Sequence, residues 1–101
     1  MQAETALYLG GFHLTQHARD RATQRGIRLE AAEIVLRFGR WILGERGYHY
    51  SLAGVRRART VAPGLWNEAR RVVVVVDHYG NIPTLYADDG GKAPGHGFCP
   101  R

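Results

Sequence analysis

The stretch RVVVVVDHYGNIPTLYA, residues 71–87, sets the fold of this chain. Its five consecutive valines favour a strand, because β-branched side chains pack well on a pleated sheet. An unbroken apolar run also indicates burial on both faces of that sheet. We therefore expect residues 72–76 to form the central strand.

The residues after the valines predict a hairpin. Residues 77–81 have the composition of a loop, and residues 82–87 are expected to return as the partner strand. Pro83 has no amide donor, so it is expected to face away from a ladder bond or to sit at a bulge. The side chains predicted to share one face of this partner strand are Ile82, Thr84 and Tyr86.

Further strands are predicted upstream of the valines. Residues 41–43 can start a strand, and residues 48–52 alternate as in a half-buried strand, with glycines bracketing the turn between them. Val55, Arg57, Arg59 and Val61 stand at every second position, so this segment can extend the sheet. A Pro63-Gly64 turn follows.

Helical spacing dominates the first part of the chain, after a lead-in of about twelve residues. Thr15 is a suitable N-cap for a helix over residues 16–25, and Gly26 can end that helix in a left-handed conformation. A second helix is expected over residues 29–38, with Gly39 as its stop. The order predicts an α+β fold, in which two N-terminal helices pack on a small antiparallel sheet of about four strands.

Length and composition fit one globular domain. The chain has 101 residues, of which 45% are hydrophobic and 23% charged. We expect a single domain over residues 1–87 and a flexible glycine-rich tail over residues 88–101. No apolar run has the length of a membrane span, and the first residues do not read as a signal peptide. The single cysteine, Cys99, cannot form an internal disulfide, which favours a reducing, cytoplasmic location.

The charge is strongly basic and almost entirely due to arginine. The net charge is +5, and thirteen of the fourteen basic residues are arginines. The arginines gather in segments 17–28 and 54–71. Two basic clusters in a small domain predict a polyanionic partner, most commonly RNA or DNA, unless the arginine content only reflects genome base composition. The arginines expected to contact RNA are Arg25, Arg56, Arg57, Arg59, Arg70 and Arg71.

One side of the first predicted helix carries a polar stripe. Residues three or four apart share a helix face, so His17, Arg21 and Arg25 stack along one side, opposite small apolar residues. An imidazole beside guanidinium groups suits a phosphate-bearing partner. The plainer interpretation is a solvated helix face, because arginine is a good helix former.

The chain resembles the bacterial family called domain of unknown function 4258. The resemblance covers roughly residues 12–87, and the family's helix typically starts with a His-Ala-x-x-Arg-Met-x-x-Arg-Gly-Ile pattern. Ala22 stands here where the family usually has methionine, and Pro83 lies inside the final strand pattern. The matching segments are His17-Ala18-Arg19-x-Arg21-x-x-x-Arg25-Gly26-Ile27 and Ile82-x-Thr84-Leu85-Tyr86.

This resemblance implies a fold shared with the small ribonuclease toxins that include barnase, EndoU, some colicins and RelE. It implies a metal-independent endoribonuclease, as the toxin of a toxin–antitoxin pair or as an effector domain. RNA would be its substrate, an antitoxin or immunity protein its partner, and no cofactor or membrane would be involved. Thr84 and Tyr86 match the last strand of the family, where Thr84 would contact RNA.

The chemistry of such cleavage is available in the sequence. The 2′-hydroxyl attacks the phosphorus, so the enzyme needs a base, an acid and positive charge at the phosphate. His17 can serve as acid or base and Arg21 as the phosphate clamp. Candidates for the second proton group are Tyr86, His49 and His78. No metal site is expected, because His96 and Cys99 supply only two ligands.

A non-catalytic RNA-binding or protein-interaction module on the same fold is the alternative, since fold alone does not decide function. The two readings differ in the surroundings of His17. Catalysis requires that His17 face Arg21 and a proton donor on the sheet across an open cleft. A His17 packed in a dry core would favour the binding module.

Overall fold

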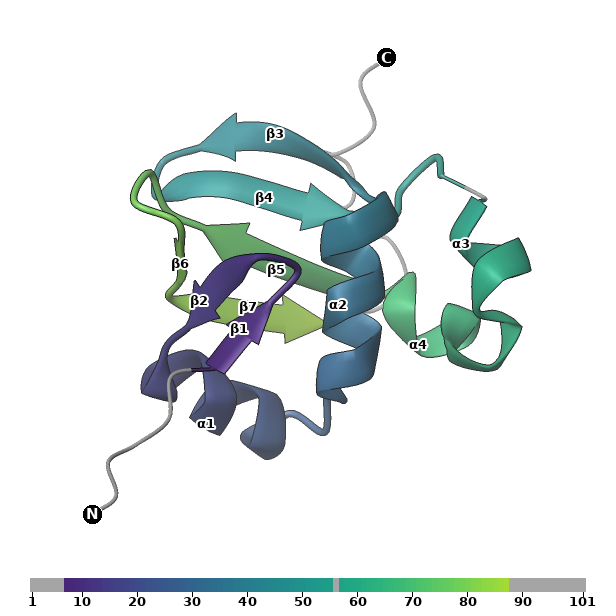
Figure 1. Ribbon diagram of the computed structural model, residues 1–101, viewed down its shortest axis with the longest axis horizontal. Coiled ribbons are helices and arrows are strands. Elements are labelled where there is room, and N and C mark those ends of the chain that lie inside the picture. The colour runs from purple at the N-terminus through teal and green to yellow at the C-terminus, as the bar shows by residue number, and fades with distance from the viewer. Residues whose placement is uncertain (1–6, 56, 88–101) are drawn as a thin grey trace.

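The computed structural model describes residues 7–55 and 57–87 of the chain (Figure 1). These residues form an α+β domain, as the sequence predicts. The elements, in chain order, are β1 (Leu7–Leu9), β2 (Phe12–Leu14), α1 (Gln16–Gln24), α2 (Leu29–Phe38), β3 (Arg40–Gly44), β4 (Gly47–Ser51), α3 (Arg57–Val61), a 3₁₀ turn (Pro63–Leu65), α4 (Trp66–Ala69), β5 (Val72–Val76), β6 (Asn81–Ile82) and β7 (Thr84–Ala87).

The valine run is an interior strand of the main sheet, and this prediction is confirmed. The sheet has the strand order β3-β4-β5-β7, and each neighbouring pair is antiparallel. All five valines of β5 are buried. Val72, Val74 and Val76 belong to the core between sheet and helices, whereas Val73 and Val75 point to the opposite face.

The two helices lie where the spacing predicts them, within one residue. The Thr15 hydroxyl accepts a hydrogen bond from the Ala18 amide at 3.1 Å and caps α1. Gly26 follows α1 with φ +67°, a conformation that glycine adopts without steric cost. α1 packs along β7 and α2 packs on β5 and β4, so both helices cover the same face of the sheet (Figure 1).

The helices are not the N-terminal elements, so that part of the prediction is wrong. A hairpin of β1 and β2 precedes them, closed by Gly10 and Gly11 with φ values of +58° and +91°. β2 also pairs in parallel with β6, which gives a second sheet of order β1-β2-β6. Strands of three residues are too short to show a periodic pattern, and tertiary pairing stabilises them.

The segment before the valine run is helical, which corrects the predicted sheet extension. Arg57–Val61 forms α3, and the 3₁₀ turn and α4 follow it. Val61 is 59% exposed, so the alternation of valine and arginine does not mark the buried face of a strand. A single apolar residue every few positions fits a short surface helix equally well.

The returning partner strand is interrupted at Pro83, which lies between β6 and β7. Only Thr84–Ala87 pairs with β5, because proline cannot donate to a continuous ladder. Ile82 is fully buried in the core with Leu85, so it does not share a face with Thr84 and Tyr86 as predicted.

Two sequence predictions concern residues outside the described ranges. The flexible tail over residues 88–101 lies beyond them, as do His96 and Cys99. Within residues 7–55 and 57–87, none of the helices has the length and apolarity needed to cross a membrane.

Candidate functional site

α1 is fixed at both of its ends, to β6 at its start and to the edge strand β7 at its end. At its start, the Thr15 hydroxyl donates a hydrogen bond to the Ile82 carbonyl oxygen at 2.7 Å. At its end, Arg25 Nη1 donates to the Leu85 carbonyl oxygen at 3.2 Å. Ala18 and Ala22 are buried beneath the helix, which lets it lie close to the strand. α1 is therefore held between Ile82 of β6 in the second sheet and Leu85 of β7 in the main sheet.

The polar stripe of α1 reaches β7 at the C-terminal end of the helix, through Arg25. Arg25 reaches the backbone of β7, and Arg21 and His17 follow one and two turns earlier on the same face. Arg21 Nε donates a hydrogen bond to His17 Nε2 over 3.4 Å. His17 is exposed and Arg21 is half-buried, so the imidazole and the guanidinium are together at the surface.

The arrangement of this pair defines its chemistry. Arg21 Nε points at Nε2 of His17, and in this contact Nε2 is the hydrogen-bond acceptor. An unprotonated imidazole nitrogen can accept a proton, and a guanidinium can bind a phosphate through two parallel hydrogen bonds. Both groups needed to activate and hold a phosphodiester thus lie within one turn of helix.

Thr84 and Tyr86 project from β7 on the side away from the helices. Thr84 is opposite Val75 and Tyr86 is opposite Val73 in the register of the sheet. Leu85, between them, points into the helix-covered core and is fully buried. Tyr86 therefore lies on one side of the β7 backbone, and the His17–Arg21 pair lies on the helix-covered side.

His49 and His78 are elsewhere. His49 is on β4, which β5 separates from β7, and its ring lies against Gly44 of β3, where a Cβ would meet Nε2 at 2.7 Å. Burial lowers the pKa of His49, which favours the neutral ring. His78 is exposed in the turn after β5, where its ring contacts Tyr48 at 5.3 Å between centroids. The structure does not bring either histidine to the stripe on α1.

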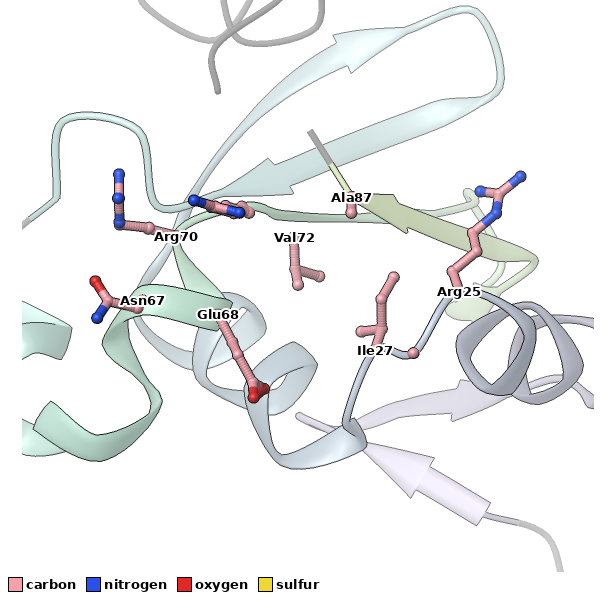
Figure 2. A pocket seen from close by; sticks show the side chains of 9 residues that line it. Arg25, Ile27, Asn67, Glu68, Arg70, Val72 and Ala87 are labelled. Carbon is pink, nitrogen blue, oxygen red and sulfur yellow. The ribbon is translucent and has the colours of Figure 1, made fainter. Parts of the chain in front are cut away.

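An arginine-lined hollow opens at the C-terminal end of α1. It has a volume of about 530 Å³. Figure 2 shows Arg25 at one end and Arg70 with Asn67 at the other, with Val72 and Ile27 between them. The full lining, which we call the arginine pocket, is Arg25, Gly26, Ile27, Asn67, Glu68, Arg70, Arg71, Val72 and Ala87.

The arginine pocket is electropositive because its acidic residue is already paired. Glu68 receives three hydrogen bonds from Arg28, the shortest at 2.7 Å. These bonds lower the pKa of Glu68 and raise that of Arg28. Within the part of the chain that the structure describes, Arg25, Arg70 and Arg71 form no ion pair. Three arginines thus line the rim of the hollow, where Arg25 also donates to the Leu85 carbonyl oxygen.

The predicted RNA-binding arginines are only partly brought together. Arg25, Arg70 and Arg71 share the pocket, although the first is more than forty residues from the others. Arg59 is exposed on α3 and is not part of the lining. Arg56 and the side chain of Arg57 lie outside the description.

Asn67 and the hollow itself were not anticipated from the sequence. The pocket forms where the end of α1 meets α4, and the short apolar pair Leu65-Trp66 was the only sequence signal of packing there. Across residues 7–55 and 57–87, no three histidine, cysteine, aspartate or glutamate side chains come together as metal ligands would.

Comparison with known proteins gave no relative: no family model, no curated protein and no solved structure matches this chain.

Proposed function

We propose that this protein is a metal-independent endoribonuclease whose catalytic edge is the seam between α1 and β7. The observation that carries the proposal is the contact of Arg21 with His17 on a stripe that continues through Arg25 into the arginine pocket. The stripe supplies a proton acceptor and a phosphate clamp, and the pocket supplies charge for the neighbouring phosphates. Single-stranded RNA would run along the edge of the sheet from the polar stripe of α1 to the arginine pocket.

In the proposed reaction, a phosphodiester draws the Arg21 guanidinium away from His17 Nε2 and onto a non-bridging oxygen. Nε2 then takes the proton of the 2′-hydroxyl, and the 2′-oxygen forms a bond to phosphorus. The bond from phosphorus to the 5′-oxygen breaks, and a water molecule donates a proton to that leaving oxygen, because the β7 backbone separates Tyr86 from the His17–Arg21 pair. The products are a 2′,3′-cyclic phosphate and a 5′-hydroxyl, and His17 returns its proton to the hydroxide left by that water.

The resemblance to domain of unknown function 4258 supports the same proposal. α1 and the turn after it carry the first motif, and β7, which carries most of the second, packs beside α1. We include in the proposal that the protein is a bacterial toxin acting in the cytoplasm, with an antitoxin or immunity protein as its partner.

The experiment is incubation of the purified protein with total RNA in the presence of EDTA. We expect cleavage by the parent protein, with 2′,3′-cyclic phosphate ends on the products. His17→Ala should reduce the rate by about a hundredfold to ten-thousandfold, the usual cost of losing a positioned acid or base. Arg21→Lys should also slow cleavage, because an ammonium cannot replace the guanidinium fork.

His78→Ala is the matched control, because it removes an exposed histidine far along the chain from the stripe. It should cleave at the parent rate. Equal rates for His17→Ala and the parent, or activity that depends on added divalent metal, would refute the assignment.

A non-catalytic RNA-binding module is the second candidate. The observation in its favour is that Tyr86 and the His17–Arg21 pair lie on opposite sides of the β7 backbone. This candidate predicts RNA binding that weakens steeply with salt, as counterions are released from each phosphate contact, together with no cleavage at all.

A further inference from the structure

The main sheet has one edge strand that nothing in the described residues covers. β7 forms one edge and has α1 packed along it, whereas β3 forms the other edge and pairs only with β4 in residues 7–55 and 57–87 (Figure 1). An edge strand presents a row of N–H and C=O groups that can pair with another chain. The β3 edge is therefore the place in this fold where a further strand can be added.

β3 has one charged residue, Arg40, among the features that usually protect such an edge, and it has no proline or bulge. Its sequence is Arg40-Trp41-Ile42-Leu43-Gly44, without proline or lysine. Its register with β4 runs from Arg40 opposite Ser51 to Gly44 opposite Gly47 without a bulge. Long, regular and apolar edge strands of this kind promote association between chains.

The exposed apolar side chains of β3 continue the buried layer of the sheet. Trp41 lies in one row with Tyr50 and Val74, and Leu43 lies in the next row with Tyr48 and Val76. Both valines are buried in the core. Trp41 is 52% exposed and Leu43 is 61% exposed, so the apolar face of the sheet ends uncovered at β3.

We propose that β3 is a self-association surface and that its occupant is the β3 strand of a second copy of this chain. The two strands pair antiparallel about a two-fold axis at Ile42. Trp41 of each copy then lies opposite Leu43 of the other, so both exposed side chains gain an apolar neighbour on the same face. Such an isologous joint closes after two copies.

Other two-fold registers are poorer. Centring the axis on Trp41 places Leu43 opposite Gly39, and centring it on Leu43 places Trp41 opposite Glu45. Each of these registers leaves a large apolar side chain without an apolar partner across the joint. The register about Ile42 is the only one of the three that pairs Trp41 with Leu43.

Charged side chains lie at both ends of the register about Ile42. Arg40 of one copy comes opposite Gly44 of the other, next to Glu45 in the β3–β4 turn. Arg40 and Glu45 form no ion pair within the described residues of one copy. Arg46 aligns with residue 38, two positions beyond Arg40. Each end of the joint thus brings Arg40 near both Glu45 and Arg46 of the other copy, so the pairing of Trp41 with Leu43 decides the register.

The joined molecule is an eight-stranded sheet with a β7 edge at each far end. The seams between α1 and β7 are then as far from the joint as the sheet allows. Association through β3 therefore goes beyond the proposed function and does not depend on it. A joint of five residue pairs is small, so we infer a weak dimer rather than an obligate one.

The experiment uses two variants with opposite charges, Trp41→Lys/Leu43→Lys and Trp41→Glu/Leu43→Glu. Sedimentation velocity is measured from about 10 µM to about 1 mM, because interfaces below about 1,200 Å² are typical of weak complexes. The parent should shift from the monomer of 11.3 kDa towards twice that mass as its concentration rises. Each variant alone should associate at least tenfold more weakly, since like charges oppose each other across the joint.

Mixing the two variants should restore association by at least tenfold over either variant alone. Both remain net positive, at +7 and +3 from the parent value of +5, so net charge does not attract them. Circular dichroism confirms that each is folded, as the exposure of both side chains leads us to expect. A parent that stays monomeric at every concentration overturns the inference, as does a mixture that associates no better than its components.

Discussion

The two edges of the main sheet are built in opposite ways. Along β7, a helix covers the strand, small alanines let it approach, and polar side chains emerge at the seam. Along β3, no described element follows, and large apolar side chains remain at the surface. A sheet edge can thus be covered by a helix of the same chain and carry polar site residues, as we propose for β7. It can also be left uncovered and serve association between chains, as we propose for β3.

The largest expected effect tests the closed edge. Ala18→Asp places a carboxylate in the fully buried contact between α1 and β7, where it has no partner. We expect the free energy of unfolding to fall by at least about 3 kcal/mol, the scale for an uncompensated buried charge. Urea denaturation measures the loss.

Leu43→Asp on the open edge is the matched control for that substitution. Leu43 is exposed, so the free energy of unfolding should change by less than about 0.5 kcal/mol. Equal losses for the two variants would show that the edges do not differ in the way that we describe.

A smaller effect separates the two edges in their contact with RNA. Arg70→Ala/Arg71→Ala removes two positive charges from the arginine pocket. Each lost phosphate contact should reduce the slope of log affinity against log salt concentration by about 0.7 for single-stranded RNA. Fluorescence anisotropy at several salt concentrations gives the slope.

Arg40→Ala/Arg46→Ala makes the same change of charge at the β3 edge. This variant should keep the parent slope, because its arginines lie outside the pocket. If both double variants lower the slope equally, the arginine pocket is not a distinct RNA-binding site.

The smallest expected effect is on the pH dependence of folding stability, through His49 of β4 next to the β3 edge. Burial lowers the pKa of His49, so below pH 6.5 the unfolded chain binds a proton that the folded chain resists. The folded state therefore loses stability as pH falls through this range, and the contribution vanishes above pH 6.5. His49→Gln should flatten the dependence between pH 7 and pH 5.5 in thermal melts, whereas a dependence unchanged by the substitution would contradict it.

The elements that have strong local signals in the sequence were predictable from it. α1 was predicted from the Thr15 cap and the stop at Gly26, and β5 from its five valines. β1 and β2 were missed because each has three residues, although Gly10-Gly11 was a readable turn signal. The segment 55–61 was misassigned because sparse alternation does not distinguish a half-buried strand from a surface helix.

Only the part of the candidate site that lies on α1 was predictable from the sequence. Helical spacing alone placed His17, Arg21 and Arg25 on one face. The pocket was not predictable, since it depends on how Arg25 meets Arg70 and Arg71 across the folded chain. The position of His49 against Gly44 likewise depends on side-chain packing between strands, which periodicity does not specify.

The parallel pairing of β2 with β6 joins the beginning of the domain to its end. Leu14 is opposite Ile82, and the Thr15 hydroxyl binds the same residue at its carbonyl. During synthesis, α1 can therefore be anchored to Ile82 only after nearly the whole domain has been made. Contacts so distant along the chain form late, because closing a long loop costs conformational entropy before the new contacts stabilise the structure. The seam that carries His17 and Arg21 is thus completed only when the last strands arrive.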